Sequence, residues 1–327
     1  MKKKVWLSFT IVVVLLMAVV LFSMVSGSIN ISAVELFKGL LFGGHEEVEV
    51  IKNMRFPRII VSLLAGANLA VSGLLLQAVM RNPLAEAGII GISSGANFVA
   101  LTMISFFPTL FFWMPLFAFF GGMLACFLVY SLSWKSGLQP LRLILVGVAV
   151  NAIFTALYES FDYRGYTTTS SVKATASALS QQTWDDVQIL TIYGLIGFIL
   201  SFCVYSWCNV LALQDKTARN LGIHVTRARV VISLIAVYLA SVTTATVGVI
   251  AFVGLLIPHI GRLIVGSDYK ILLPFSILSG ALLMVTADTI GRVLLAPTEL
   301  PASIIMALIG GPFLILLIRR SDRIYEG

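Results

Sequence analysis

The stretch "RNPLAEAGIIGISSGAN", residues 81–97, separates two long apolar runs and decides how the chain folds. It is polar at its start, where Arg81, Asn82, Pro83 and Glu86 lie, and rich in glycine and serine afterwards. Irregular backbone is tolerated at membrane depth only where protein buries it or where it lines a water-filled cavity. Glycine permits close approach and unusual dihedral angles. We therefore interpret the stretch as a candidate pore or gate element, with an ordinary connecting loop as the alternative.

The composition is that of a membrane protein. Hydrophobic residues make up 59% of the 327 residues and charged residues 11%, with a mean hydropathy of +1.00. Soluble domains carry about 25% charged residues. The apolar run near the N-terminus exceeds the core of a cleaved signal peptide, about 7–15 residues, so we expect it to be retained. The sequence predicts an all-α, polytopic membrane protein whose residues 1–327 form a single transmembrane domain.

About ten membrane-spanning helices are expected, because apolar runs of the required length of about 20 residues recur. Pro108 and Pro115 divide one overlong run, and Gly248 divides another. The expected spans are 5–26, 57–80, two within 96–134, 141–159, 187–211, two within 230–265, 271–295 and 302–318. The longest polar segment, residues 161–187, could contain a short surface helix.

The distribution of Lys and Arg predicts the orientation. With the N-terminus inside, fifteen of the 22 basic residues lie in inside segments, six lie outside, and Arg292 lies within a span. Cytoplasmic loops carry the excess of Lys and Arg. We therefore expect both termini and the 81–97 stretch on the cytoplasmic side, in agreement with an even number of spans.

No enzymatic motif lies in the structural context that its chemistry requires. "GISSG", residues 91–95, matches G-x-S-x-G, but a hydrolase elbow needs a preceding strand and a partner base, and no histidine is tied to Ser93 by pattern. No Walker-A motif occurs. We expect no catalytic residue, no metal site, no cofactor bound by this chain and no nucleic-acid partner.

Charged residues inside or beside spans have two interpretations each. Asp288 and Arg292, four apart, could form an intrahelical ion pair in which Arg292 keeps Asp288 ionised, or mark a pathway or docking site. Arg55 and Arg58 open the second span from outside. They could snorkel to the interface or capture carboxylates of an external partner.

The inside loop "LQDKTARNLGIHVTRARV", residues 213–230, is too patterned for a plain linker. Leu221-Gly222 indicates the end of a short helix, with glycine as the C-terminal stop. A solvated basic loop and a docking helix for a cytoplasmic partner are the two alternatives.

Together these motifs resemble the FecCD-type permeases, the membrane subunits of ABC importers for iron–siderophore chelates, haem and cobalamin. The resemblance covers nearly the whole chain. It rests on "RFPR", "LAVSGLLLQAVMRNPLA", "NPLAEAGIIGISSGA", "LILVGVAVN", "FVGLLIPHIGRLIVGSDYKILLP", "ADTIGR" and "ELPASIIMALIGGPFLILL", in that order.

The resemblance implies partners and roles. The partners are a second permease subunit, in a homo- or heterodimer, two cytoplasmic ATPase subunits that bind ATP and Mg, and an extracytoplasmic substrate-binding lipoprotein. The chain would lie in the lipid of the cytoplasmic membrane. The implied roles are the translocation path and cytoplasmic gate (Asn82, Pro83, Leu84, Ser93, Ser94, Asn151), binding-protein docking (Arg55, Arg58, Arg292) and ATPase coupling (Asp215, Ala218, Arg219, Leu221, Gly222).

Two departures from the family pattern leave the substrate open. Ser303 and Met306 replace a glycine and a threonine of the last helix, and "ALSQQTW" replaces a Gly-Ser pair before Trp184. We expect both regions to face the path or the outer vestibule. An iron chelate, ferric siderophore or haem, is the leading substrate, with cobalamin as the alternative. An ion-coupled secondary transporter is a different class, and would need a buried acidic relay near the midplane.

Overall fold

The structure is a computed structural model that describes residues 2–26, 46–133, 140–163, 179–213, 215–296 and 298–325. Its helices are α1 (Lys2–Val25), α3 (Glu46–Met80), α4 (Ile92–Phe106), α5 (Met114–Ser133), α6 (Pro140–Tyr163), α8 (Trp184–Leu211), α9 (Asp215–Asn220), α10 (Val225–Val247), α11 (Val253–Val265), α12 (Tyr269–Leu294) and α13 (Ala302–Tyr325). Short 3-10 helices cover Pro108–Trp113 and Leu179–Gln181. The described residues contain no strand, which confirms the all-α prediction.

The ten expected spans each correspond to a helix. Among the described residues, seven helices are long and apolar enough to cross a membrane, and three shorter apolar helices cover 92–106, 253–265 and 302–317. The two predicted divisions fall at residues 107–113 and 248–252, beside Pro108 and at Gly248. The second span was predicted to begin near residue 57. Instead α3 begins at Glu46 and continues through Pro57, because its polar first turns extend beyond the apolar stretch. The possible surface helix in 161–187 falls mostly on residues 164–178, outside the described residues.

Helix α3 lies at the centre of the bundle and packs against α8, α10, α11 and α12. Small residues allow these close approaches, as is usual between helices in membranes. A Cβ on Gly73 would overlap the backbone of Gly254 in α11, and one on Gly66 would overlap the carbonyl of Gly280 in α12. The central helix therefore meets two neighbours at glycine pairs that admit no side chain.

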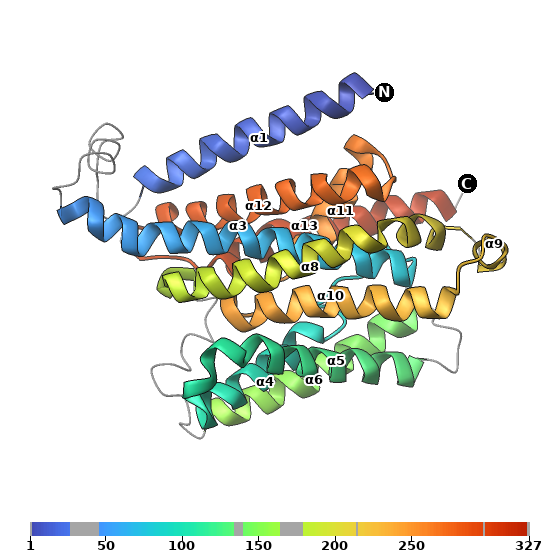
Figure 1. Cartoon of the computed structure of the whole chain (residues 1–327), viewed down its shortest axis with the longest axis horizontal. Coiled ribbons are helices and arrows are strands. Elements are labelled where there is room, and N and C mark those ends of the chain that lie inside the picture. The colour runs from blue at the N-terminus through green and yellow to red at the C-terminus, as the bar shows by residue number, and fades with distance from the viewer. Residues whose placement is uncertain are drawn as a thin grey trace.

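The remaining helices form layers on both sides of this centre (Figure 1). Helix α1 lies along one edge beside α12 and α3, and α4, α5 and α6 form the opposite layer, with α10 between them. The N-terminus, the C-terminus and α9 all lie at one end of the bundle, here called the basic end. Helix α6 packs mainly against α4 and α5, and α13 packs mainly against α12 and α11.

Two short helices begin inside the protein. Helices α4 and α11 have 15 and 13 residues, and at 1.5 Å per residue they are about 20 Å long, less than the roughly 30 Å of a bilayer core. Their N-cap residues, Gly91 and Phe252, are left-handed, with φ of 82° and 72°. Residues 81–91, here called the re-entrant segment, lead from α3 into α4, and residues 248–252 join α10 to α11. Most residues of the re-entrant segment after Leu84 are buried or half-buried, as irregular backbone at membrane depth requires.

Candidate functional site

The re-entrant segment begins with a turn that Asn82 fixes. The Asn82 side-chain oxygen accepts a hydrogen bond from the Leu84 amide at 2.9 Å, and its backbone oxygen accepts one from the Ala85 amide at 3.2 Å. Asparagine commonly forms such turns. Asn82 is buried, Leu84 is half-buried and Pro83 is exposed. The turn thus places two of the predicted gate residues at the basic end of α3, where they can meet a neighbouring surface.

Arg81 joins this turn to the end of α8. Its guanidinium donates to the Leu211 carbonyl at 2.7 Å and to the Leu213 carbonyl, both at the C-terminal end of α8 immediately before α9. The last carbonyls of a helix lack intrahelical donors, and a cation there is favourable. Arg81 holds a left-handed backbone conformation, with φ of 48°. The re-entrant segment is therefore bonded directly to the chain that enters α9.

Glu86 joins the middle of the re-entrant segment to the start of α11. Its side chain is buried, and both carboxylate oxygens lie 3.0 Å from the Phe252 amide nitrogen. No side chain within α11 caps that helix, so Glu86 accepts one of its otherwise unpaired amides. The ring of Phe252 lies against Gly310 of α13, where a Cβ would overlap it. A contact path thus runs from the re-entrant segment through α11 to α13.

The last part of the re-entrant segment packs on α6. A Cβ on Gly91 would lie 3.0 Å from the Asn151 amide nitrogen, and one on Gly147 would lie 2.8 Å from the Ile89 carbonyl. Asn151 is half-buried at this contact. Four predicted path residues, Asn82, Pro83, Leu84 and Asn151, therefore belong to, or directly touch, the same irregular segment.

Ser93 and Ser94 lie in the first turn of α4 and are buried. The Ser94 hydroxyl donates to the Gly91 carbonyl at 2.9 Å. The chain before them is irregular rather than a strand, so their geometry gives the hydrolase interpretation no support. Among the described residues no group of three or more His, Cys, Asp or Glu side chains could hold a metal ion.

Arg58 lies in a buried charge cluster at the end of the bundle opposite the basic end. Its Nε lies 3.0 Å from each Asp288 carboxylate oxygen, its Nη2 2.9 Å from Asp288 Oδ1, and its Nη1 2.7 Å from Glu299 Oε2. Forked, charge-assisted contacts of this kind are the strong ones. Of the two interpretations of Asp288, the intrahelical ion pair with Arg292 is not the one formed. Asp288 pairs with Arg58 of α3, because the packing of α3 on α12 presents a guanidinium in bidentate geometry.

Arg292 and Arg55 bind the end of α1. Arg292 donates to the Ser23 carbonyl at 2.7 Å and to the Ser23 hydroxyl at 2.8 Å. Arg55 donates to the Met24 carbonyl at 2.9 Å. All three predicted docking arginines are buried, at 7%, 7% and 4% relative exposure for Arg55, Arg58 and Arg292. They hold α1 and α12 to α3, which is a structural role that the sequence did not indicate.

The surface between α9 and α10 has the form predicted for a docking helix. Asp215 begins α9, Ala218 is buried beneath it, and Arg219 and Leu221 are exposed. The predicted glycine stop is confirmed: Gly222 has a φ of 81° and its amide donates to the Arg219 carbonyl at 2.9 Å. Beside it lies an open hollow of about 740 Å³ lined by Arg219, Gly222, Ile223, His224, Val225, Thr226 and Arg227.

The two regions in which the sequence departs from the family pattern are not both exposed at a path or vestibule. Met306 is fully buried in the core with Ile305 and Met284, so the expectation that it faces the path or vestibule is wrong. Ser303 is half-buried. In the other region, Leu179 is buried and the Gln182 amide donates to the Thr246 carbonyl at 3.1 Å. These two residues pack into the bundle rather than line a vestibule.

Sequence reasoning missed two residues of the site, Arg81 and Glu86. The only signal was the presence of two charged side chains in a stretch flanked by apolar runs. Their partners, Leu211, Leu213 and Phe252, lie 130, 132 and 166 positions away. No local pattern predicts such pairs.

The fold and this site define a multi-pass α-helical membrane protein of the transporter class, with broken helices and irregular backbone buried at membrane depth. The chain belongs to the FecCD transport family, which matches residues 15–320.

Relatives and solved structures agree with this assignment. The chain is 40% identical to "Probable heme-iron transport system permease protein IsdF" of Staphylococcus aureus (strain Newman), over 98% of each chain. It is similar to a structure described as an inward-facing metal-chelate type ABC transporter, with 28% identity, a TM-score of 0.78 and coverage of 97% of this chain and 99% of that one. The PsaBC structure from Streptococcus pneumoniae, at 17% identity and a TM-score of 0.62 over 87% of this chain and 95% of that one, shares the fold.

Proposed function

We propose that the chain is the permease subunit of a binding-protein-dependent ABC importer that moves an iron chelate, haem or a ferric siderophore, across the cytoplasmic membrane. Separate ATPase subunits would bind ATP and Mg and supply the energy, and this chain would hold no cofactor. The haem-iron relative at 40% identity favours haem among the chelates. The observation that carries the proposal is the bonded connection from the end of α8, beside α9, through Arg81 to the re-entrant segment.

The coupling step follows from that connection. The exposed face of α9 and the basic hollow beside it form the surface for an ATPase groove, with Arg219 and Leu221 at the contact. A displacement of α9 moves the end of α8, to which the Arg81 guanidinium is bonded. Arg81 in turn moves the Asn82 turn, which displays Pro83 and Leu84. Packed helices transmit such displacements because their interfaces switch between discrete packing arrangements rather than deform continuously.

A second permease subunit would cover α6 and α13 and complete the path. Only 22% of the span in α6 is buried inside the chain. Lipid can cover its apolar side chains, but lipid offers no hydrogen bond to the half-buried amide of Asn151 in mid-helix. A water-filled path shared with a partner subunit satisfies it. The re-entrant segment, packed on α6, would then close this path on the cytoplasmic side, where the charge distribution puts both termini.

Docking of the substrate-binding lipoprotein remains a proposal for the outer end of α3 and α12. Arg55, Arg58 and Arg292 already have partners in this chain, so an acidic group of the lipoprotein would have to compete with Glu299 for Arg58. Glu299 is the accessible member, with a side chain 35% exposed, whereas Asp288 is 1% exposed. This edge of the cluster is where a partner carboxylate can enter.

The test is uptake in a strain that lacks this chain, with haem, several ferric siderophores and cobalamin offered in parallel. We expect the parent chain to restore uptake of an iron chelate only together with a Walker-A ATPase. A restored cobalamin uptake would select the alternative substrate. Uptake that survives loss of the ATPase but stops when an ionophore collapses the ion gradient would overturn the ABC mechanism in favour of ion coupling.

A further inference from the structure

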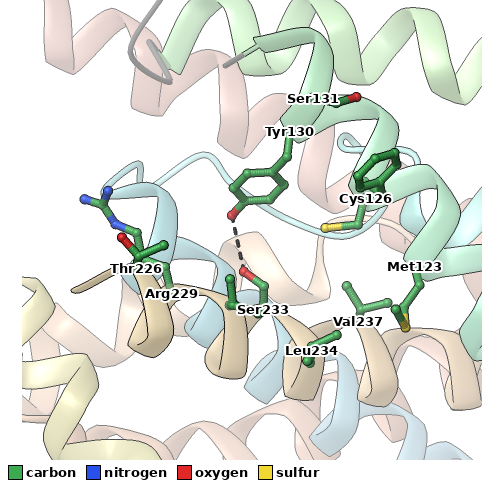
Figure 2. A pocket seen from close by; sticks show the side chains of 11 residues that line it. Met123, Cys126, Tyr130, Ser131, Thr226, Arg229, Ser233, Leu234 and Val237 are labelled. Carbon is green, nitrogen blue, oxygen red and sulfur yellow. Dashed lines mark hydrogen bonds between the residues drawn. The ribbon is translucent and has the colours of Figure 1, made fainter. Parts of the chain in front are cut away.

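A groove separates α5 from α10 toward the basic end of the bundle (Figure 2). The two helices approach closely at Gly122, where a Cβ would overlap the Ser241 hydroxyl. Toward the basic end, α5 contributes larger side chains, including Tyr130 and Phe127, to the wall of a cavity that lies between the two helices. The resulting cavity has a volume of about 630 Å³.

The walls of the groove change character along its length. Met123 and Val237 lie at its inner end beside Leu234. Phe127 also belongs to the apolar wall. Thr226, Arg229 and Ser131 lie nearest the basic end, and Figure 2 shows Arg229 at the far side of Tyr130 from Met123. Thr226 and Val237 are 11 positions apart on α10, which corresponds to about 16 Å of helix.

The middle of the groove has few polar groups that lack a hydrogen-bond partner. The hydroxyls of Tyr130 and Ser233 share a hydrogen bond of 3.3 Å across it. Polar recognition is therefore concentrated at the basic end, and the rest of the groove suits a hydrocarbon chain. Phe127, Val230 and Leu234 are exposed, at 67%, 53% and 38%, so the groove opens on the face that the bilayer covers.

We propose that this groove binds an anionic phospholipid of the leaflet at the basic end, with an acyl chain between α5 and α10 and its phosphate at Arg229. The groove is apolar over most of its length and cationic at one end, which matches the apolar acyl chains and the negatively charged head group of an anionic phospholipid. Basic pockets between membrane helices on the cytoplasmic side bind anionic head groups, and Arg forms forked contacts with phosphate.

The site lies next to the proposed coupling surface. Arg229 is on the first turns of α10, and Thr226 lines both the groove and the hollow beside α9. The lipid would therefore brace α10 against α5 where the ATPase is proposed to act. Lipid binding itself does not depend on transport, so its test is separate from that of the proposed function.

The test uses the purified full chain in detergent with two photoactivatable lipids that carry the same diazirine acyl chain, phosphatidylglycerol and phosphatidylcholine. We expect phosphatidylglycerol to label peptides from 123–131 and 226–237 preferentially. Arg229→Gln should weaken phosphatidylglycerol labelling about fivefold to tenfold, from one lost cationic contact. It should weaken phosphatidylcholine labelling less, because the choline ammonium already offsets the phosphate charge of that lipid. Arg227→Gln is the matched control, since Arg227 is exposed on the same helix and does not line the groove.

A second variant tests the chain-binding part independently of charge. Leu234→Trp fills the groove from its exposed wall and should reduce labelling by both lipids, with the melting temperature of the protein as the check that it is folded. Equal labelling by the two lipids, or an equal loss in Arg227→Gln and Arg229→Gln, would overturn the head-group assignment. Labelling confined to other helices would overturn the site.

Discussion

Replacing Arg81 with alanine tests the connection between α9 and the re-entrant segment. The Arg81 guanidinium makes two hydrogen bonds, to the Leu211 and Leu213 carbonyls. A hydrogen bond to a charged group contributes about 1.5–3 kcal/mol when buried, and the partial exposure of Arg81 lowers the pair to about 1–2 kcal/mol. That energy corresponds to about a 5- to 30-fold change in an equilibrium.

The assay is uptake by the permease reconstituted with its ATPase subunits in proteoliposomes, with ATP hydrolysis measured in the same vesicles. We expect Arg81→Ala to lower the amount of chelate moved per ATP by about 5- to 30-fold, while the ATPase still co-purifies. The Arg81→Lys variant should be intermediate, because an ammonium keeps the charge but not the planar fork.

The matched control is Arg142→Ala. Arg142 also donates to a carbonyl near a helix end, that of Leu132 at 3.2 Å, and this contact joins α6 to the end of α5 rather than to the end of α8. It should leave the ratio of transport to hydrolysis near the parent value. Parent-like transport by Arg81→Ala, or an equal defect in Arg142→Ala, would refute the role of Arg81 as the connecting residue.

Three further predictions concern stability, measured as the midpoint of thermal unfolding in detergent. Glu86→Ala should lose about 1–3 kcal/mol because it leaves a buried α11 amide unpaired, and Glu86→Gln should lose less because its carbonyl still accepts; equal losses would contradict the capping role. Arg58→Ala should lose about 3–5 kcal/mol because Asp288 stays buried without its forked partner, with Arg58→Lys milder; a parent-like midpoint for Arg58→Ala would show that the cluster is not structural. Gly73→Ala should destabilise by about 1–3 kcal/mol through overlap with the Gly254 backbone, and an unchanged midpoint would mean that α3 and α11 can separate without loss.

The sequence by itself determined the helices and where they break. A bilayer leaves the backbone few ways to satisfy its hydrogen bonds, so apolar runs of sufficient length must be helical. The breaks beside Pro108 and at Gly248 followed from residues that cannot continue a helix or that permit a positive φ. The short helix ending at Gly222 was predictable for the same reason, because glycine tolerates the left-handed stop.

Only the tertiary structure decided which charged groups meet. The local rule paired Asp288 with Arg292, four positions away, yet the structure pairs it with Arg58, 230 positions away. Arg292 and Arg55 instead bind carbonyls of α1, and Glu86 reaches the α11 amide. A side chain in a medium of low dielectric takes the partner that packing places in bonding geometry, and the packing of α3 on α11 and α12 depends on glycine contacts far apart in the sequence.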